Sequence, residues 1–189
     1  SFVFPQLGKH PLGSGVIKLP SLGDLRFRQS RPYPDGFKVK QARVVRRASG
    51  FYLLLNFQSD ACIPDALLGG KFVGVDVGLA YFLSTSEGVQ VKRPKFFVSM
   101  QRQLKSLQRS LKNKQLGSAN WQKQQRRIAR LHERIANTRK NFHFKQAHAL
   151  CDAADVVVVE NLNLTGLSRG CLGKHMLDAG HGQFLNQVL

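Results

Sequence analysis

The sequence has 189 residues, 42% of them hydrophobic, so it is long enough for one or two small hydrophobic cores. Its 29 Lys and Arg residues outnumber 11 Asp and Glu residues, which gives a formal net charge of +18. Such a charge repels itself unless a polyanion neutralises it, so nucleic acid is the first partner to consider. The apolar content excludes a disordered basic tail, and no run of about eighteen apolar residues predicts a membrane span.

The cysteines indicate an intracellular protein. Cys62, Cys151 and Cys171 are odd in number and far apart, which excludes both a disulfide framework and a CxxC metal site. A reducing setting fits this pattern best. The sequence begins at Ser1 and ends at Leu189 within a helical pattern, so we expect it to be a piece of a longer protein.

Residues 1–70 contain short alternating apolar runs separated by Pro and Gly, which predict a small antiparallel β module. The runs cover 15–19, 25–28, 37–40 and 52–57. Several polar positions are basic, so one face is a candidate nucleic-acid contact, although an ordinary half-exposed sheet explains the pattern equally well. The candidate contacts are Lys18, Arg26, Arg28, Arg46 and Arg47. Residues 64–70 are expected to link this module to the next unit.

Two apolar runs further along the chain each end in a carboxylate. Residues 72–76 read as a buried strand that ends at Asp76. Residues 156–160 form a second, β-branched run that ends at Glu160. This symmetry singles out Asp76 and Glu160 as candidate functional groups.

A basic helical hairpin is predicted between the two carboxylates. Apolar residues recur at steps of three and four over about 99–115 and again over about 119–152, with a break and a new cap at Gly117-Ser118. Within 92–145, sixteen basic residues face a single acid. Most lie off the apolar stripes, so we expect the hairpin to present them to a phosphate backbone; a merely solvated face is the alternative. The candidate contacts are Arg102, Lys105, Arg109, Arg126, Arg127, Arg130, Arg134, Arg139 and Lys140.

The order of elements predicts where the carboxylates meet. With hairpin strands expected over 80–85 and 88–91, the order is βββαβ, and the crossover rule places the last strand parallel to the first. Asp76 and Glu160 then emerge at one sheet edge, about 5 Å apart, where oxygen ligands favour Mg²⁺ or Mn²⁺. The alternative is that Asp76 only forms a turn and that Glu160 has no special role.

The segments Gly74-Val75-Asp76-Val77-Gly78 and Val158-Val159-Glu160-Asn161-Leu162, with the basic hairpin between them, resemble the first two motifs of a known nuclease domain. This is the RuvC domain of TnpB, the RNA-guided nuclease of insertion sequences, which is similar to compact type V CRISPR effectors. The resemblance implies an α/β fold, with an RNase H-like (RuvC) domain over 71–189 that carries the helical hairpin at about 99–152. Over 1–70 it implies a small antiparallel β-barrel like the wedge module of that family.

The same resemblance implies a site and partners. Asp76 and Glu160 correspond to the first and second catalytic carboxylates and hold Mg²⁺ or Mn²⁺. Guide RNA and target DNA are the implied partners, with no membrane, in the cytoplasm at a prokaryotic nucleoid. The third catalytic Asp of the family, after a four-Cys zinc ribbon, is expected beyond Leu189, so zinc is expected only in such a C-terminal segment. On this basis the 189 residues are expected to bind nucleic acid and to cleave it poorly.

Residues near the C-terminal end are not expected to replace the third acid. Asp178, before Ala179-Gly180, is expected to cap the helix that follows it rather than to complete the site. Cys171, His175 and His181 lack the spacing of a structural zinc site, so we expect unpaired loop residues.

Three functional hypotheses follow. The first is the core of a transposon-associated RNA-guided DNA endonuclease that cleaves phosphodiesters with a metal. The second is a catalytically inactive nucleic-acid-binding module, an RNA-guided regulator. The third is a sugar-kinase-like or actin-like ATPase, which also begins with a strand and Asp-x-Gly, but the sequence has no second Gly-rich phosphate loop.

Overall fold

The computed structural model describes residues 1–5, 15–33, 35–60 and 70–189. The chain divides into two compact units, Ser1–Asp65 and Ala66–Leu189, and each is described by itself. The linker predicted at 64–70 lies, apart from Gly70, outside the described residues.

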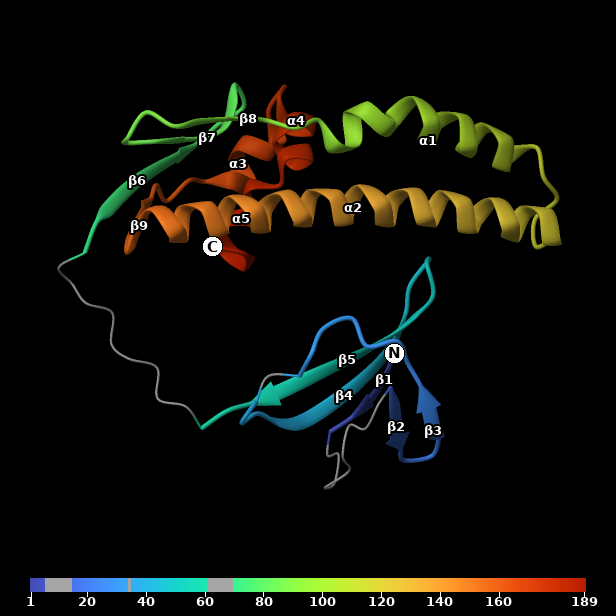
Figure 1. The fold of residues 1–189 in the computed structure, drawn as a ribbon. Helices are drawn as coiled ribbons and strands as arrows, with labels where there is room; N and C mark the ends of the chain where they lie inside the picture. The colour runs from blue at the N-terminus through green and yellow to red at the C-terminus, as the bar shows by residue number, and fades with distance from the viewer. Residues whose placement is uncertain (6–14, 34, 61–69) are drawn as a thin grey trace. The chain divides into compact units, whose positions relative to one another are not determined.

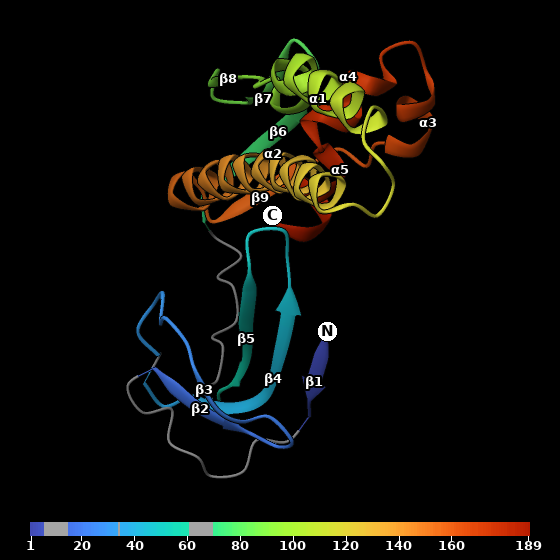
Figure 2. The same cartoon turned by 90° about the vertical axis from the view of Figure 1, so that its right-hand side faces the viewer.

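The first unit contains two antiparallel sheets (Figure 2). Its strands are β1 (Phe2–Phe4), β2 (Val16–Leu19), β3 (Gly23–Arg26), β4 (Lys38–Arg46) and β5 (Phe51–Gln58). One sheet has the order β1-β4-β5, and β2 pairs with β3 in the other. The four predicted strands therefore form, although β4 is longer than its apolar run and β1 was not predicted.

Alternation explains how these short strands make a core. In β2, Ile17 and Leu19 are buried whereas Val16 and Lys18 are exposed, because successive side chains point to opposite faces. Ile17 and Leu19 pack with Ala42 of β4 into a small buried cluster, with partly buried neighbours around it. A register shift between Val39 and Gln41 marks a bulge in β4.

The second unit is a mixed α/β structure (Figure 1). Its strands are β6 (Phe72–Val77), β7 (Tyr81–Thr85), β8 (Gln90–Lys92) and β9 (Val156–Val159). Its helices are α1 (Phe96–Lys112), α2 (Ala119–Ala153), α3 (Leu164–Arg169), α4 (Gly173–Ala179) and α5 (His181–Gln187). The sheet order is β8-β7-β6-β9, with β9 parallel to β6 as the crossover rule predicts.

The helical hairpin forms as predicted, with α1 and α2 side by side in Figure 1. Leu104 of α1 packs with Ile128, Leu131 and Ile135 of α2, which are the residues of the two predicted apolar stripes. The Ser118 side chain accepts a hydrogen bond from the Trp121 N–H at 3.2 Å and so caps α2. Gln124 is buried between the helices, and its Nε2 donates to the Leu107 carbonyl at 3.1 Å.

A second hydrophobic core packs the C-terminal part of α2 and the helices α4 and α5 against the sheet. Val73, Val75 and Val77 alternate along β6 and contribute its buried face. Phe82 of β7 and Phe184 of α5, both fully buried, complete the centre. No helix among the residues that the structure describes is long and apolar enough to cross a membrane.

Candidate carboxylate and nucleic-acid site

Parallel pairing brings the two candidate carboxylates to the same sheet edge. The register of β6 and β9 pairs Phe72 with Val156 and continues to Val75 with Val159. The ladder ends at this pair, with Asp76 the next residue of β6 and Glu160 the residue directly after β9, so both carboxylates lie at the same end of the paired strands. Both residues are exposed, which leaves their carboxylate oxygens accessible from solvent.

The opposite end of the same strand pair is pinned by a third carboxylate. Asp155 Oδ2 accepts a hydrogen bond from the Lys71 N–H at 2.8 Å, and the Asp155 N–H donates to the Lys71 carbonyl at 3.0 Å. The Ser86 hydroxyl accepts a hydrogen bond from the Gly74 N–H at 3.1 Å, which links the turn between β7 and β8 to β6. These contacts set the register that determines where Asp76 and Glu160 emerge.

A cluster of rings lies in the core next to the carboxylate edge. Phe82 stacks on His143 with ring centroids 5.3 Å apart, and the His181 ring lies 5.1 Å from Phe82. Phe142 and Phe184 meet Phe82 edge to face. His143 was not singled out from the sequence; the available signal was its position on the apolar stripe of α2, eight residues after Ile135.

Burial lowers the pKa of both histidines. For His143, burial is the largest cause, opposed by the Ala179 carbonyl that accepts from Nε2 at 2.9 Å and reinforced by Arg139. The pKa of His181 is lowered first by burial, while the Phe82 carbonyl raises it. His143 and Arg93 lower the pKa of His181 further, and the negative charge of Asp76 raises it. The core of this unit therefore favours neutral imidazoles.

Asp178 caps a helix, but not the one predicted. Its carboxylate accepts hydrogen bonds from the Phe97 N–H at 2.6 Å and the Val98 N–H at 3.3 Å, in the first turn of α1. The following helix, α5, has no side-chain cap. The prediction was wrong about the partner because the tertiary fold, not chain proximity, brings α4 to the start of α1. Asp178 is only 2% exposed and its oxygens are engaged.

The prediction that these residues lie in loops was also wrong for His175 and His181, which belong to helices. His181 lies in α5 and is buried against Phe82, because the chain re-enters the core at this helix. His175 belongs to α4, whereas Cys171 is exposed. Across the described part of the chain, no three His, Cys, Asp or Glu side chains gather to hold a metal ion.

The hairpin presents most of its predicted contact residues to solvent. Those exposed as expected are Arg102, Lys105, Arg109, Arg126, Arg127, Arg130, Arg134 and Lys140. Arg139 differs, because its side chain is only 22% exposed and its Nη2 lies 3.8 Å from Asp178 Oδ1. Its guanidinium also lies over the Phe96 ring, so Arg139 stabilises the junction of α1, α2 and α4 rather than the basic face.

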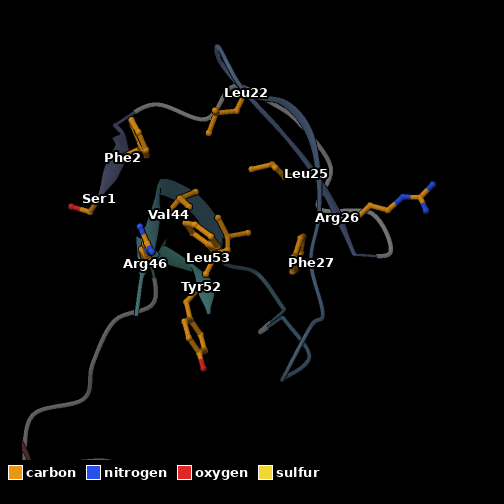
Figure 3. A pocket seen from close by; sticks show the side chains of 11 residues that line it. Ser1, Phe2, Leu22, Leu25, Arg26, Phe27, Val44, Arg46, Tyr52 and Leu53 are labelled. Atoms are coloured by element: carbon orange, nitrogen blue, oxygen red, sulfur yellow. The ribbon is translucent and has the colours of Figure 1, made fainter. Parts of the chain in front are cut away.

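The β module also carries its five candidate cations on the surface. Lys18, Arg26, Arg28, Arg46 and Arg47 are all exposed, and the Arg47 guanidinium lies 5.5 Å from the centroid of the Tyr52 ring. Two of them, Arg26 and Arg46, line a hollow of about 610 Å³ together with apolar side chains such as Leu25. Figure 3 shows the Arg26 side chain directed away from these apolar groups. Cations and apolar surface are thus neighbours in this unit.

Comparison with known proteins gives the same family along most of the sequence. Residues 59–170 match the family model OrfB_IS605, described as probable transposase. The "Putative RNA-guided DNA endonuclease InsQ" of Escherichia coli (strain K12) is 32% identical over 173 residues, which is 92% of this chain and 42% of that protein. A "Putative RNA-guided DNA endonuclease" of Streptomyces pristinaespiralis is 31% identical over 156 residues, which is 82% of this chain and 39% of that protein.

The chain thus spans about two fifths of the length of these relatives. The family match covers more than half of the chain and includes both carboxylates and the whole basic hairpin. By sequence, the chain belongs to the OrfB_IS605 family of probable transposases and is a protein of the TnpB type.

Proposed function

We propose that this chain is the core of a transposon-associated, RNA-guided DNA endonuclease. The observation that carries the proposal is the parallel pairing of β6 with β9, which brings Asp76 and Glu160 to one sheet edge on either side of a basic helical crossover. The printed names of the two relatives, both putative RNA-guided DNA endonucleases, support the same activity. Guide RNA and target DNA are the proposed partners.

The proposal includes a fold assignment for each unit. The strand order β8-β7-β6-β9 with a helical crossover into β9 supports an RNase H-like, RuvC-type domain in residues 71–189. Five antiparallel strands around one small core support a wedge-like β-barrel in residues 1–70.

Asp76 and Glu160 suit Mg²⁺ or Mn²⁺. They offer oxygen ligands only, both side chains are exposed, and Mg²⁺ is commonly held by one or two carboxylates together with water and substrate phosphate. A bound ion would activate water and stabilise the charge that develops on a phosphate during displacement. The two carboxylates would hold the ion, and the hydrogen bond between the Lys71 N–H and Asp155 helps to keep their strands in register.

The basic residues of the chain hold the substrate. Exposed Lys and Arg side chains bind phosphate groups without reading sequence, so the hairpin positions a nucleic-acid strand beside the carboxylates. Arg139 is left out of this role because it is engaged with Asp178. The exposed cations of the β module would also bind phosphate groups of guide RNA or DNA.

The test uses the full-length product of the gene with its guide RNA and a matching DNA target. Asp76→Asn and Glu160→Gln should each reduce the rate of Mg²⁺-dependent cleavage at least about a hundredfold, because each removes a metal ligand. DNA binding, measured by fluorescence anisotropy, should stay within about twofold. Glu87→Gln is the matched control, since it removes one exposed carboxylate at the opposite end of β7, where Glu87 pairs with Lys71.

Cleavage by Asp76→Asn at the wild-type rate would show that the site lies elsewhere. If no metal supports cleavage by the wild-type protein while guide-dependent DNA binding persists, the protein is the catalytically inactive regulator instead.

A further inference from the structure

A second candidate site lies where β8 ends and α1 begins. A hollow of about 460 Å³ opens there against the middle of α2, within a single compact unit. Three cationic residues, Arg93, Lys95 and Arg134, line it together with the apolar side chains of Phe96, Met100 and Ile135. None of the described residues that line this hollow is acidic. The site thus combines positive charge with an apolar wall.

Arg93 is fixed in place but incompletely paired. Its Nε donates a hydrogen bond to the Leu79 carbonyl at 2.8 Å, which holds the guanidinium against the loop after β6. Its Nη1 is buried and has no hydrogen-bond partner within the described structure. A buried donor without a partner is unfavourable, so a ligand toward which the guanidinium turns would supply the acceptor that Nη1 lacks.

The other polar groups around the hollow are already engaged. The Ser99 hydroxyl donates to the Phe96 carbonyl at 3.2 Å, and the Thr138 hydroxyl donates to the Arg134 carbonyl at 2.9 Å. The Asp178 carboxylate occupies the first-turn N–H groups of Phe97 and Val98. The donors that remain for a ligand are therefore two guanidinium groups and one ammonium group, a set that matches phosphate oxygens.

The hollow begins at the same sheet edge as the carboxylates. β7 runs antiparallel to β6, and β8 runs antiparallel to β7, with Tyr81 opposite Lys92. The end of β6, which carries Asp76, therefore lies at the same edge as the end of β8, which leads into Arg93. Arg93 and Asp76 also both act on the pKa of the buried His181.

We propose that this hollow is a nucleotide pocket for single-stranded DNA. Arg93, Lys95 and Arg134 bind one backbone phosphate, and the attached nucleoside packs against Phe96, Met100 and Ile135. The volume of about 460 Å³ is within the usual range for small-ligand pockets. The inference rests on the proposed nuclease function and deepens it, because a nucleotide held here is anchored at the edge where Asp76 and Glu160 emerge.

The methionines allow a site-specific test, since the sequence contains only Met100 and Met176. Met100 lines the hollow, whereas Met176 lies in α4 and does not. In the 189-residue chain labelled with ¹³C at the methionine methyl groups, a thymidine dinucleotide with a 5′ phosphate should shift the Met100 signal and leave the Met176 signal in place. Thymidine without phosphate should shift neither signal.

Substitutions identify the groups that bind. Lys95→Gln and Arg134→Gln should each raise the dissociation constant of the dinucleotide about tenfold. This constant is obtained by titration from the shift of the Met100 signal. Lys123→Gln, which removes an exposed cation of α2 away from the hollow, should leave that constant unchanged. Arg93→Gln should raise it as well, with circular dichroism as a check, because this variant also releases the Leu79 carbonyl.

The outcomes separate this inference from the proposed function. If a longer labelled DNA strand binds by anisotropy while Met100 does not respond to the dinucleotide, the pocket is ruled out and the nuclease proposal stands. A response to thymidine as large as that to the dinucleotide, or one insensitive to Lys95→Gln and Arg134→Gln, also overturns the pocket. If the dinucleotide shifts the Met100 signal but Asp76→Asn cleaves DNA at the wild-type rate, the pocket proposal stands and the proposed carboxylate site is overturned.

Discussion

Asp178 illustrates how a single residue gains its role from partners distant in sequence. Its carboxylate is 81 positions from Phe97 and 80 from Val98, yet it accepts both of their N–H groups. The same carboxylate lies near Arg139 of α2, so one side chain joins the start of α1, the middle of α2 and α4. An Asp in the first turn of its own helix is a common local cap, whereas a cap supplied by another helix leaves no local pattern in the sequence.

Replacing Asp178 should therefore destabilise the fold. Asp178→Ala leaves two helix N–H groups without their acceptor and Arg139 without its ion-pair partner, and we expect the free energy of unfolding to fall by about 1–3 kcal/mol. Asp178→Asn keeps one acceptor oxygen and should lose less. Urea unfolding followed by circular dichroism measures both variants. An Asp178→Ala protein as stable as the wild type would mean that these contacts contribute nothing net.

The buried histidines predict that the protein loses stability in mild acid. The folded-state pKa of His143 lies below its ordinary value of 6.5, chiefly because of burial. Below about pH 6.5 the unfolded chain therefore binds a proton that the folded protein does not, and the free energy of unfolding decreases. The decrease is at most about 1.4 kcal/mol per pH unit for one histidine.

Urea unfolding at pH 7.5 and at pH 5.5 tests this dependence. His143→Phe should reduce the loss of stability without abolishing it, because His181 is also buried and its pKa is also lowered. His132→Gln, which replaces an exposed histidine of the same helix, should leave the loss unchanged. Equal pH dependence in the wild type and in His143→Phe would assign the effect to other groups.

At the scale of elements, the clearest successes are those with strong periodicity. The helical stripes predicted the hairpin because its core is made within the two helices themselves. The apolar runs predicted β6 and β9, although only alternate residues of β6 are buried, and β9, at the edge of the sheet, leaves Val158 and Val159 exposed. The short helices α3, α4 and α5 lack such a signal, since six or seven residues make at most two turns.

The junction between α4 and α5 depends on a glycine. Gly180 has φ of 71°, and a Cβ there would lie 2.8 Å from Arg139 Cδ and 3.2 Å from His143 Cε1. Gly117, between α1 and α2, has φ of 78° but no atom within 4 Å of such a Cβ. Both positions require a positive φ, but a side chain would meet neighbouring atoms only at Gly180.

Gly180→Ala should accordingly be the more destabilising substitution. Gly117→Ala carries only the conformational cost of about 1–2 kcal/mol, whereas Gly180→Ala adds about 1–3 kcal/mol from overpacking against Arg139 and His143. Denaturant midpoints of the two variants give the comparison. Equal losses would show that Arg139 and His143 move aside without cost.

At the scale of the whole molecule, charge is the dominant feature. The net charge is +18, and sixteen of the cations lie within residues 92–145, which form one helical hairpin and the segment before it. Folding brings these groups closer together than they are in the unfolded chain, so their repulsion opposes folding. A bound polyanion or dissolved salt reduces that repulsion.

The free protein should therefore become more stable as sodium chloride is raised from about 50 mM to about 300 mM, because screening shortens the range of the repulsion. Replacing Arg102, Lys105, Arg126 and Arg127 with Gln lowers the net charge by four and should reduce this salt effect. Thermal unfolding at each salt concentration makes the measurement. A variant with the full salt dependence of the wild type would locate the repulsion outside the hairpin.

Patterns of neighbouring residues predict the secondary-structure elements and the chemical groups that they carry. Periodicity predicted the strands and the hairpin, composition predicted a polyanionic partner, and two carboxylates at strand ends predicted a candidate site. Each of these depends on residues that are close in sequence, where pattern and structure are directly linked.

Contacts between side chains that are far apart in the sequence depend on the tertiary structure. In the folded protein Asp178 caps α1, and Arg139 contacts Asp178 instead of joining the basic face. His143 and His181 are buried next to Phe82. The tertiary structure also brings Arg93 to a hollow whose walls come from two helices. Local patterns cannot specify such pairings, because they depend on how the helices and the sheet pack after the chain has crossed from β6 to β9.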